Sequence, residues 1–183
     1  MFKPTWVQYT WDLTSLPTNA PTLESRYVVN SATPADAELL DAAIARSFSM
    51  EQAWSNHMAL RMAQIRRAIQ EDLPTGKTNF IVIRHGARII GASGIRENPE
   101  VSINFVTGVC VLNEYRCRGL GTFLLHESLR QLHDKGLKTA HVITKKGVTA
   151  ERFLYPKFGG KATTPPVEAI KEMELSPSAF LSK

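Results

Sequence analysis

The stretch that decides the fold is YRCRGLGTFLLHESLRQLHDKG, residues 115–136. Its first part places two arginines and two glycines within Arg116–Gly121, and a helical pattern follows at once. Leucines in that pattern recur at spacings of three and four residues, which puts them on one face of a helix. Gly136 is a natural C-cap. The stretch therefore predicts a helix over about residues 119–135 that begins directly after a bare, positively charged turn.

Such a turn is suited to holding an anion. Several backbone N–H groups at a helix start lack partners, and the helix dipole adds partial positive charge there. Glycine leaves room for the anion, while Arg116 and Arg118 add full charges. Together these features predict a phosphate cradle. The alternative is a sharp strand-to-helix turn in which the arginines are incidental.

Two familiar phosphate-binding motifs do not fit the turn. A P-loop requires Gly-Lys-Ser/Thr, and here Thr122 comes without the lysine. The dinucleotide fingerprint Gly-x-Gly-x-x-Gly would require glycine where the chain has Leu124. The sequence therefore excludes both nucleotide motifs at this place.

Composition sets the class of protein. The chain has 183 residues, of which 43% are hydrophobic and 21% charged, as in one soluble globular domain. No apolar run approaches the ~20 residues of a membrane helix, so no membrane partner is expected. Cys110 and Cys117 form neither a disulfide framework nor a metal-binding pattern, which favours the reducing cytoplasm and no metal site. The net charge of +5 suits a phosphate-bearing partner. Without basic runs interleaved with aromatic residues, nucleic acid is not expected.

The chain is predicted to form an N-terminal extension, residues 1–23, followed by one domain over residues 24–183. Three prolines and no helical period mark the extension, but its aromatic rings indicate that it packs on the domain. Gly108 predicts a bulge or a close backbone approach. The alternation of elements indicates a mixed α/β sheet. The predicted elements are a strand at 26–30, helices beginning at 33–36 and 49–52, strands at 80–83, 89–95 and 101–112, a helix at 119–135, a strand at 139–144, a short helix at 149–155 and a last strand at 170–175.

Arg116-x-x-Gly119-x-Gly121, placed between a strand and a helix, resembles the Gln/Arg-x-x-Gly-x-Gly/Ala signature of the GCN5-related N-acetyltransferases, the GNAT superfamily. The strand over residues 109–116 resembles that family's fourth strand, and residues 153–160 resemble its "LY-x-x-x-GF" segment, with glycine at 160 where phenylalanine is usual. The order of elements fits over residues 25–178. The resemblance implies the acyl-CoA N-acyltransferase fold, with a central, mostly antiparallel sheet flanked by helices.

The resemblance also implies acetyl-CoA as the cofactor. In the family, the pyrophosphate rests on the amides of the glycine turn, and the pantetheine arm pairs with the preceding strand. A backbone N–H of that strand can polarise the acetyl carbonyl, as a small oxyanion hole does. The residues that the resemblance assigns to the cofactor are Val109, Cys110, Val111, Arg116, Cys117, Arg118, Gly119, Leu120, Gly121 and Thr122.

The family reaction is direct attack of an amine on the thioester, which needs an acid or a hydrogen bond for the leaving thiolate. Tyr155 occupies the position of that acid in many relatives, with a core aromatic residue as the alternative. The family's usual asparagine, seven residues earlier, is replaced by Val148. Glu97, Glu100 and His57 are candidate bases, with ordinary structural roles as their alternative, and a chain of waters can do the same work.

Together these features predict an N-acetyltransferase that moves an acetyl group from acetyl-CoA to a primary amine of a small molecule or a protein. The acceptor itself cannot be predicted. The extension is expected to cover the acceptor pocket or to join a homodimer interface. The alternative is a GNAT-like module that binds acyl-CoA without turnover, as a sensor or an assembly part, which Val148 and the lack of an obvious base favour.

Overall fold

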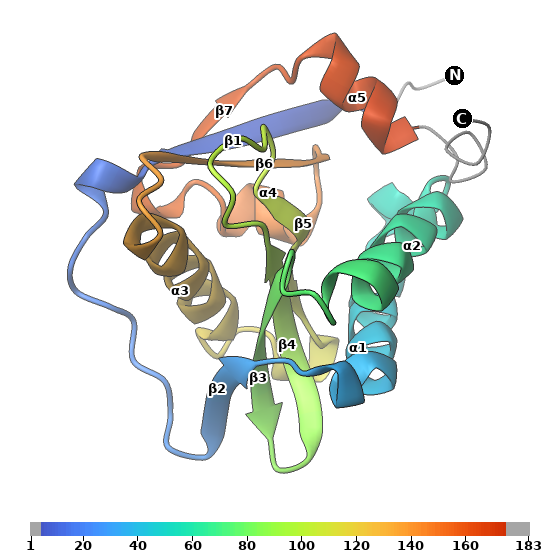
Figure 1. Cartoon of the computed structure of the whole chain (residues 1–183), viewed down its shortest axis with the longest axis vertical. Helices are drawn as coiled ribbons and strands as arrows, with labels where there is room; N and C mark the ends of the chain where they lie inside the picture. Colours follow the sequence, from blue (N-terminus) through green and yellow to red (C-terminus); the bar gives the residue numbers. More distant parts are fainter. Residues whose placement is uncertain (1–4, 175–183) are drawn as a thin grey trace.

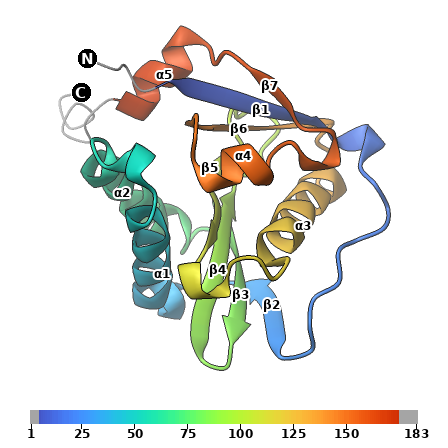
Figure 2. The ribbon, with the colours of Figure 1, turned by 180° about the vertical axis from the view of Figure 1, so that it is seen from behind.

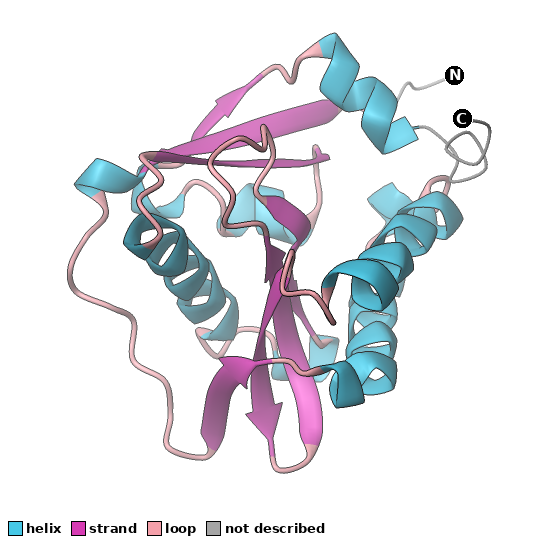
Figure 3. Cartoon of the chain, viewed as in Figure 1, coloured by secondary structure: helices cyan, strands magenta, loops and turns pink. Residues whose placement is uncertain are grey.

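The computed structural model describes residues 5–174, in which two antiparallel sheets are flanked by helices (Figures 1 and 3). Every paired strand is antiparallel to its neighbour. The larger sheet has the order β2–β3–β4–β5 and the smaller one the order β6–β1–β7. The strands are β1 (Trp6–Asp12), β2 (Tyr27–Ser31), β3 (Asn79–His85), β4 (Arg88–Ile95), β5 (Phe105–Val111), β6 (Thr139–Lys145) and β7 (Lys161–Thr163).

Helices cover both faces of the larger sheet. Helix α3 lies on one side, and α1 and α2 lie on the other, as the front and back views agree (Figures 1 and 2). No helix within residues 5–174 is long and apolar enough to cross a bilayer. The helices are α1 (Ala37–Ser49), α2 (Met58–Arg67), α3 (Leu120–Asp134), α4 (Thr149–Phe153) and α5 (Val167–Glu174).

The first helix begins where the sequence predicted. Asp36 accepts a hydrogen bond from the backbone N–H of Thr33 at 2.8 Å, and a short turn over Pro34–Asp36 leads into α1. The second helix was predicted to start at residues 49–52, and this was wrong. The chain instead makes a short turn at Gln52–Trp54 before α2 begins at Met58. The reason is tertiary packing, because the Trp54 ring is buried edge-on against Phe48, 5.2 Å between centroids.

The predicted N-terminal extension is corrected for residues 6–12. This segment is strand β1, the middle strand of the smaller sheet, and it pairs with β6 from Trp6↔Lys145 to Asp12↔Thr139. Its rings are buried as predicted, with Trp11 fully inaccessible. The strand escaped prediction because its hydrogen-bonding partner lies some 130 residues further along the chain.

The predicted last strand at residues 170–175 was also wrong. Residues 167–174 form helix α5, and position 175 lies outside the described residues. Ala169, Ile170 and Met173 pack against the core, and their spacing of one, three and four residues belongs to a helix face. The short strand β7 was not predicted.

Strands β5 and β6 belong to different sheets and meet at only one end. There the backbone N–H of Asn104 donates to His141 O at 3.1 Å, and the N–H of His141 donates to Asn104 Oδ1 at 3.0 Å. Beyond these contacts no backbone ladder joins the two strands in the described residues. Where the two strands separate, their backbone N–H and C=O groups are not paired with each other and can form hydrogen bonds to a ligand.

Candidate active site

The glycine turn lies at the start of α3. Cys117 and Gly119 both have positive φ, 60° and 78°, and Gly119 is the N-cap of the helix. No backbone N–H of residues 117–122 donates a hydrogen bond within the described part of the chain. The space around Gly119 is open, since a Cβ there would meet no atom within 4 Å. Unpaired amides, a helix start and free space fit the diphosphate of a coenzyme A thioester.

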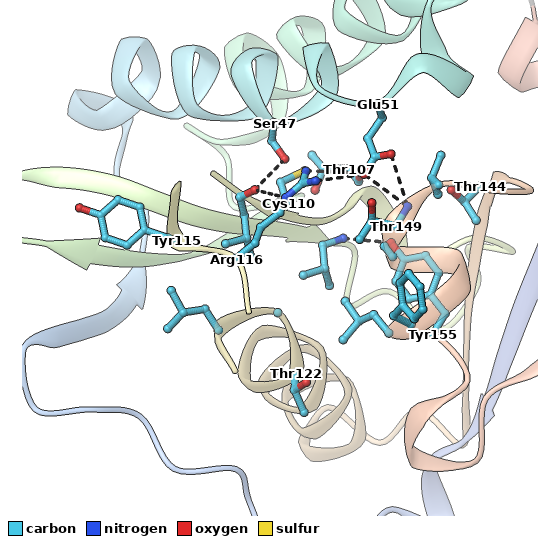
Figure 4. Close-up of a pocket in the computed structure, with 18 of the residues that line it drawn as sticks. Ser47, Glu51, Thr107, Cys110, Tyr115, Arg116, Thr122, Thr144, Thr149 and Tyr155 are labelled. Carbon is cyan, nitrogen blue, oxygen red and sulfur yellow. Dashed lines mark hydrogen bonds and ion pairs between the residues drawn. The ribbon is translucent and has the colours of Figure 1, made fainter. Parts of the chain in front are cut away.

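The two arginines of the turn have different surroundings. Arg116 turns inward, where Nε donates to Val111 O at 3.2 Å and Nη1 to Glu51 at 3.3 Å (Figure 4). Arg118 stays at the surface and donates to the carbonyl of Glu114 at 3.1 Å. The charge of Arg116 is therefore already paired with the carboxylate of Glu51. The unpaired amides of residues 117–122 are the main groups left to bind an anion.

A cavity of about 510 Å³ runs from this turn to Tyr155 (Figure 4). Strand β5 and helix α4 form two of its walls. The N-terminal end of α3 and the C-terminal end of α1 also line it. The cavity brings together nearly all the residues that the sequence analysis assigned to the site, with Arg118 outside its lining. Those in the lining are Val109, Cys110, Val111, Arg116, Cys117, Gly119, Leu120, Gly121, Thr122 and Tyr155.

Tyr155 is buried, with its hydroxyl held against β5. Its oxygen accepts a hydrogen bond from the backbone N–H of Val109 at 3.1 Å. The rings of Tyr9 and Trp11 lie beside its ring, each with centroids 5.8 Å away. Burial raises the pKa of the phenol well above its ordinary value. Tyr155 therefore keeps its proton, and because its oxygen is the acceptor in the bond to Val109, the O–H remains free to donate.

Gly108 makes this hydrogen bond possible. Its φ of +69° is one that L side chains rarely adopt, and a Cβ there would lie 2.5 Å from Tyr155 Oη. The bulge that Gly108 predicted is confirmed, because the pairing of β5 with β4 shifts register next to Gly108. The group that comes close to Gly108 is the phenol of Tyr155.

Cys110 lies on the same strand but is not suited to a nucleophilic role. Its thiol is buried, and burial raises its pKa to about 12. A neutral thiol is a poor nucleophile. The site therefore gives no support to a covalent acetyl-cysteine step.

The candidate bases do not line the cavity. Glu97 pairs with Lys135 at 3.4 Å, and Glu100 is exposed in the loop after β4. His57 lies 2.6 Å from Lys145 Nζ, and burial lowers the pKa of its imidazole. The acid that does line the cavity, Glu51, was missed.

Glu51 connects two walls of the cavity. Its Oε1 accepts from Arg116 Nη1 and from the backbone N–H of Thr149, both at 3.3 Å (Figure 4). Residues 49–52 carry the pattern of a helix start, and this pattern hid the role of Glu51. Glu51 could have been found from its place in the chain. It is an acidic residue between the end of α1 and the short turn at Gln52–Trp54.

Two departures from the family pattern have structural counterparts. Val148 is buried in the cavity wall and offers no polar side chain there. At Gly160, a Cβ would collide with the backbone oxygen of Tyr155 and lie 2.7 Å from Trp11 Nε1. Trp11 of β1 thus fills the space next to residue 160, and its Nε1 donates to Lys157 O at 2.9 Å.

No group of three or more His, Cys, Asp or Glu side chains that could hold a metal ion lies within residues 5–174.

The comparisons with known proteins agree with this geometry. The model of the Acetyltransferase (GNAT) family matches residues 38–159, more than half of the chain, and the chain therefore belongs to this family of acetyltransferases. No curated protein sequence matches the chain.

Solved structures show the same fold. A GCN5-related N-acetyltransferase from Sphaerobacter thermophilus has a TM-score of 0.60 and 19% identity, covering 88% of this chain and 50% of that one. A GCN5-related N-acetyltransferase from Ralstonia eutropha has a TM-score of 0.58 and 18% identity, covering 76% and 95%. A Drosophila protein has a TM-score of 0.62 and 14% identity, covering 88% and 49%. The chain thus spans about half the length of the Sphaerobacter and Drosophila proteins.

Proposed function

We propose that this protein transfers an acetyl group from acetyl-CoA to a primary amine by direct attack. The observation that carries the proposal is one cavity with unpaired helix-start amides at one end and a protonated, buried tyrosine at the other. Acetyl-CoA, when bound, supplies an activated acetyl thioester. The remaining requirements are binding, orientation and proton transfer, which fall to the residues of the chain.

Binding is assigned to the turn and to strand β5. The amides of residues 117–122 and the dipole of α3 favour a diphosphate. The exposed Gly119 keeps that approach open. On β5, Val109 N–H and Val111 C=O point away from β4 toward the cavity, where they bond to side chains. A pantetheine arm that paired with β5 in the manner of an added strand would take over these two groups from the side chains that now bond to them.

Proton transfer is assigned to Tyr155. As the amine nitrogen bonds to the acetyl carbon, the bond from carbon to sulfur breaks and the sulfur needs a proton. Tyr155 holds a proton that it can give, and its bond from Val109 N–H stabilises the phenolate that briefly forms. The proton released by the amine leaves through water, since the candidate bases do not line the cavity.

The test is thiol release from acetyl-CoA with a panel of primary amines. Tyr155→Phe is expected to lower kcat by about 10²–10⁴-fold, the usual contribution of a general acid, with acetyl-CoA binding retained. Tyr9→Phe is the matched control, because the Tyr9 hydroxyl donates to Glu151 and lies outside the cavity lining. An unchanged kcat in Tyr155→Phe would remove the tyrosine from the mechanism.

A second candidate function is an acyl-CoA-binding module without turnover. The observations that favour it are the apolar Val148 and the occupation of Val109 N–H by Tyr155, which leaves that donor engaged. Saturable binding of acetyl-CoA, with no thiol released for any amine tried, would support this candidate over the enzyme.

A further inference from the structure

A second cavity, of about 390 Å³, lies on the other side of the place where β5 and β6 part. Neighbouring residues of a strand face opposite sides of a sheet. Accordingly, Thr107 and Thr144 line the first cavity, while Val106 and Ile143 line the second. Helices α2 and α5, on the same side of the molecule, supply two of the other walls (Figures 1 and 2). Two ligands could therefore approach the same gap from opposite sides.

Arg61 of α2 is the unusual group in this second cavity. Its side chain is buried, at 8% exposed, yet no carboxylate among the described residues lies within ion-pair distance of it. Its Nη2 donates to Val106 O and its Nη1 weakly to Gln64 at 3.4 Å, but its Nε has no partner in residues 5–174. Burial lowers the pKa of the guanidinium to about 10, so that it stays charged at neutral pH. A buried cation without an anion is costly.

The acids around this cavity do not neutralise Arg61. Asp72 pairs with Arg96 at 3.2 Å, and Glu71 pairs with Arg67 at 3.0 Å. The remaining acid in the lining, Glu172, is exposed on α5. Arg96 also has a buried Nε without a partner in the described residues. Arg61 thus carries a positive charge that no acid of the described residues neutralises, and Arg61 and Arg96 each keep one buried Nε–H without a partner there.

Arg61 also adjoins the first cavity. Its guanidinium carbon lies 5.9 Å from the centre of the Trp54 ring, and Trp54 lines the first cavity. Its charge lies close enough to Tyr155 and Cys110 to act on the pKa of both. A group bound to Arg61 would therefore lie next to the proposed reaction centre.

We propose that the acceptor is an amine that also carries a carboxylate, and that Arg61, assisted by Arg96, binds this carboxylate in the second cavity. A guanidinium is the side chain best matched to a carboxylate, through charge-assisted hydrogen bonds in a planar fork. The carboxylate supplies the missing anion, and the amine then faces the gap between β5 and β6. This inference rests on the proposed acetyltransferase function and names its substrate class.

The first test compares matched acceptors in the thiol-release assay: glycine, leucine and lysine, each against its own amide. The wild-type protein is expected to show at least a tenfold higher kcat/KM for the acid of the preferred pair. This order opposes intrinsic reactivity, because the carboxylate favours the protonated, unreactive form of the amine. Equal values, or turnover of amides alone, would overturn the inference while leaving the acetyltransferase function in place.

Variants then assign the preference to Arg61. Arg61→Gln is expected to lose at least tenfold in kcat/KM for the acid and little for the amide, so that their ratio falls to about one. Arg66→Gln is the matched control, because Arg66 is exposed on the same helix and pairs with Asp41. If Arg61→Gln does not fold, Arg96→Gln is expected to cause a smaller loss for the acid alone. An unchanged acid-to-amide ratio in the folded variants would contradict the assignment.

A binding measurement keeps the inference testable if no amine is turned over. With CoA present, calorimetry is expected to show saturable binding of N-acetylleucine, at least tenfold tighter than that of its amide, and weakened at least tenfold by Arg61→Gln. Binding of this kind without turnover would contradict the acetyltransferase function and support the carboxylate site. Absent or equal binding of acid and amide would overturn the site.

Discussion

The two ends of the first cavity are built in different ways. At one end, the glycine turn is made of consecutive residues, 116–122, and its geometry follows from where a strand stops and a helix begins. At the other end, Tyr155 depends on Val109 and Gly108 of β5 and on Tyr9 and Trp11 of β1, which lie far from it in the sequence. The glycine turn is therefore set by neighbouring residues, whereas the surroundings of Tyr155 form only once the whole chain has folded.

This difference predicts that distant substitutions affect the Tyr155 end more than the glycine turn. The largest effect on stability is expected from Trp11→Ala, because the ring is fully buried between β5 and Tyr155. The free energy of unfolding should fall by about 3–5 kcal/mol, as for other large-to-small changes of aromatic residues in cores. Denaturant titration measures it.

Leu39→Ala is the control for Trp11→Ala, since Leu39 is half exposed on α1 and should change stability by less than about 0.5 kcal/mol. A similarly small loss for Trp11→Ala would mean that β1 is an accessory to the fold, as an extension would be.

A smaller and more specific effect is expected from Gly108→Ala. The added methyl group meets Tyr155 Oη, and the backbone has positive φ, so stability should fall by about 1–3 kcal/mol and kcat should fall with it. Gly86→Ala is the matched control, because Gly86 has a similar φ of +60° but open space around it. Gly86→Ala should lower the free energy of unfolding because of its positive φ, but it should leave kcat unchanged. If both variants lose kcat equally, contact with Tyr155 is not the cause.

Features built from neighbouring residues could be predicted from the sequence, whereas features built from distant residues could not. The glycine turn, strands β3 and β4, the start of α1 and the leucine face of α3 all rest on residues close together in the sequence, and all were predicted. Strand β1 was missed because what makes it a strand is β6, more than 120 residues away. Glu51 was missed because its partners, Arg116 and Thr149, come from two other parts of the chain. Helix α5 was mistaken for a strand because a short apolar run fits either period.

The smallest effect concerns a second locally built feature, the capping box at the start of α1. Asp36→Ala should lower the free energy of unfolding by about 1 kcal/mol at neutral pH. In the folded protein the pKa of Asp36 is lowered, first by the backbone N–H of Thr33 and then by Arg84. The ionised Asp36 therefore adds to the free energy of unfolding at pH values above the ordinary pKa of a carboxyl group. This contribution is lost as the pH falls through the lowered pKa of Asp36 in the folded protein.

Denaturant titrations of Asp36→Ala at neutral and acid pH measure this difference, which should narrow in acid. Asp41→Ala, which removes an exposed ion pair with Arg66, serves as the control and should cost less than about 0.5 kcal/mol. A wild-type advantage that stays constant down to strongly acid pH would contradict the role given to the ionised carboxylate.

Calorimetric titration with acetyl-CoA, of the wild-type protein and of Gly119→Glu, tests the central claim most directly. Gly119 is exposed, and its Cβ position is open, but its φ is +78°, so the fold of the variant is first checked by its melting curve. We expect saturable binding by the wild-type protein and at least about a hundredfold weaker binding by the variant, whose carboxylate would repel a phosphate at the helix start. Equal affinities, or no binding by the wild-type protein, would contradict the assignment of the turn to the diphosphate.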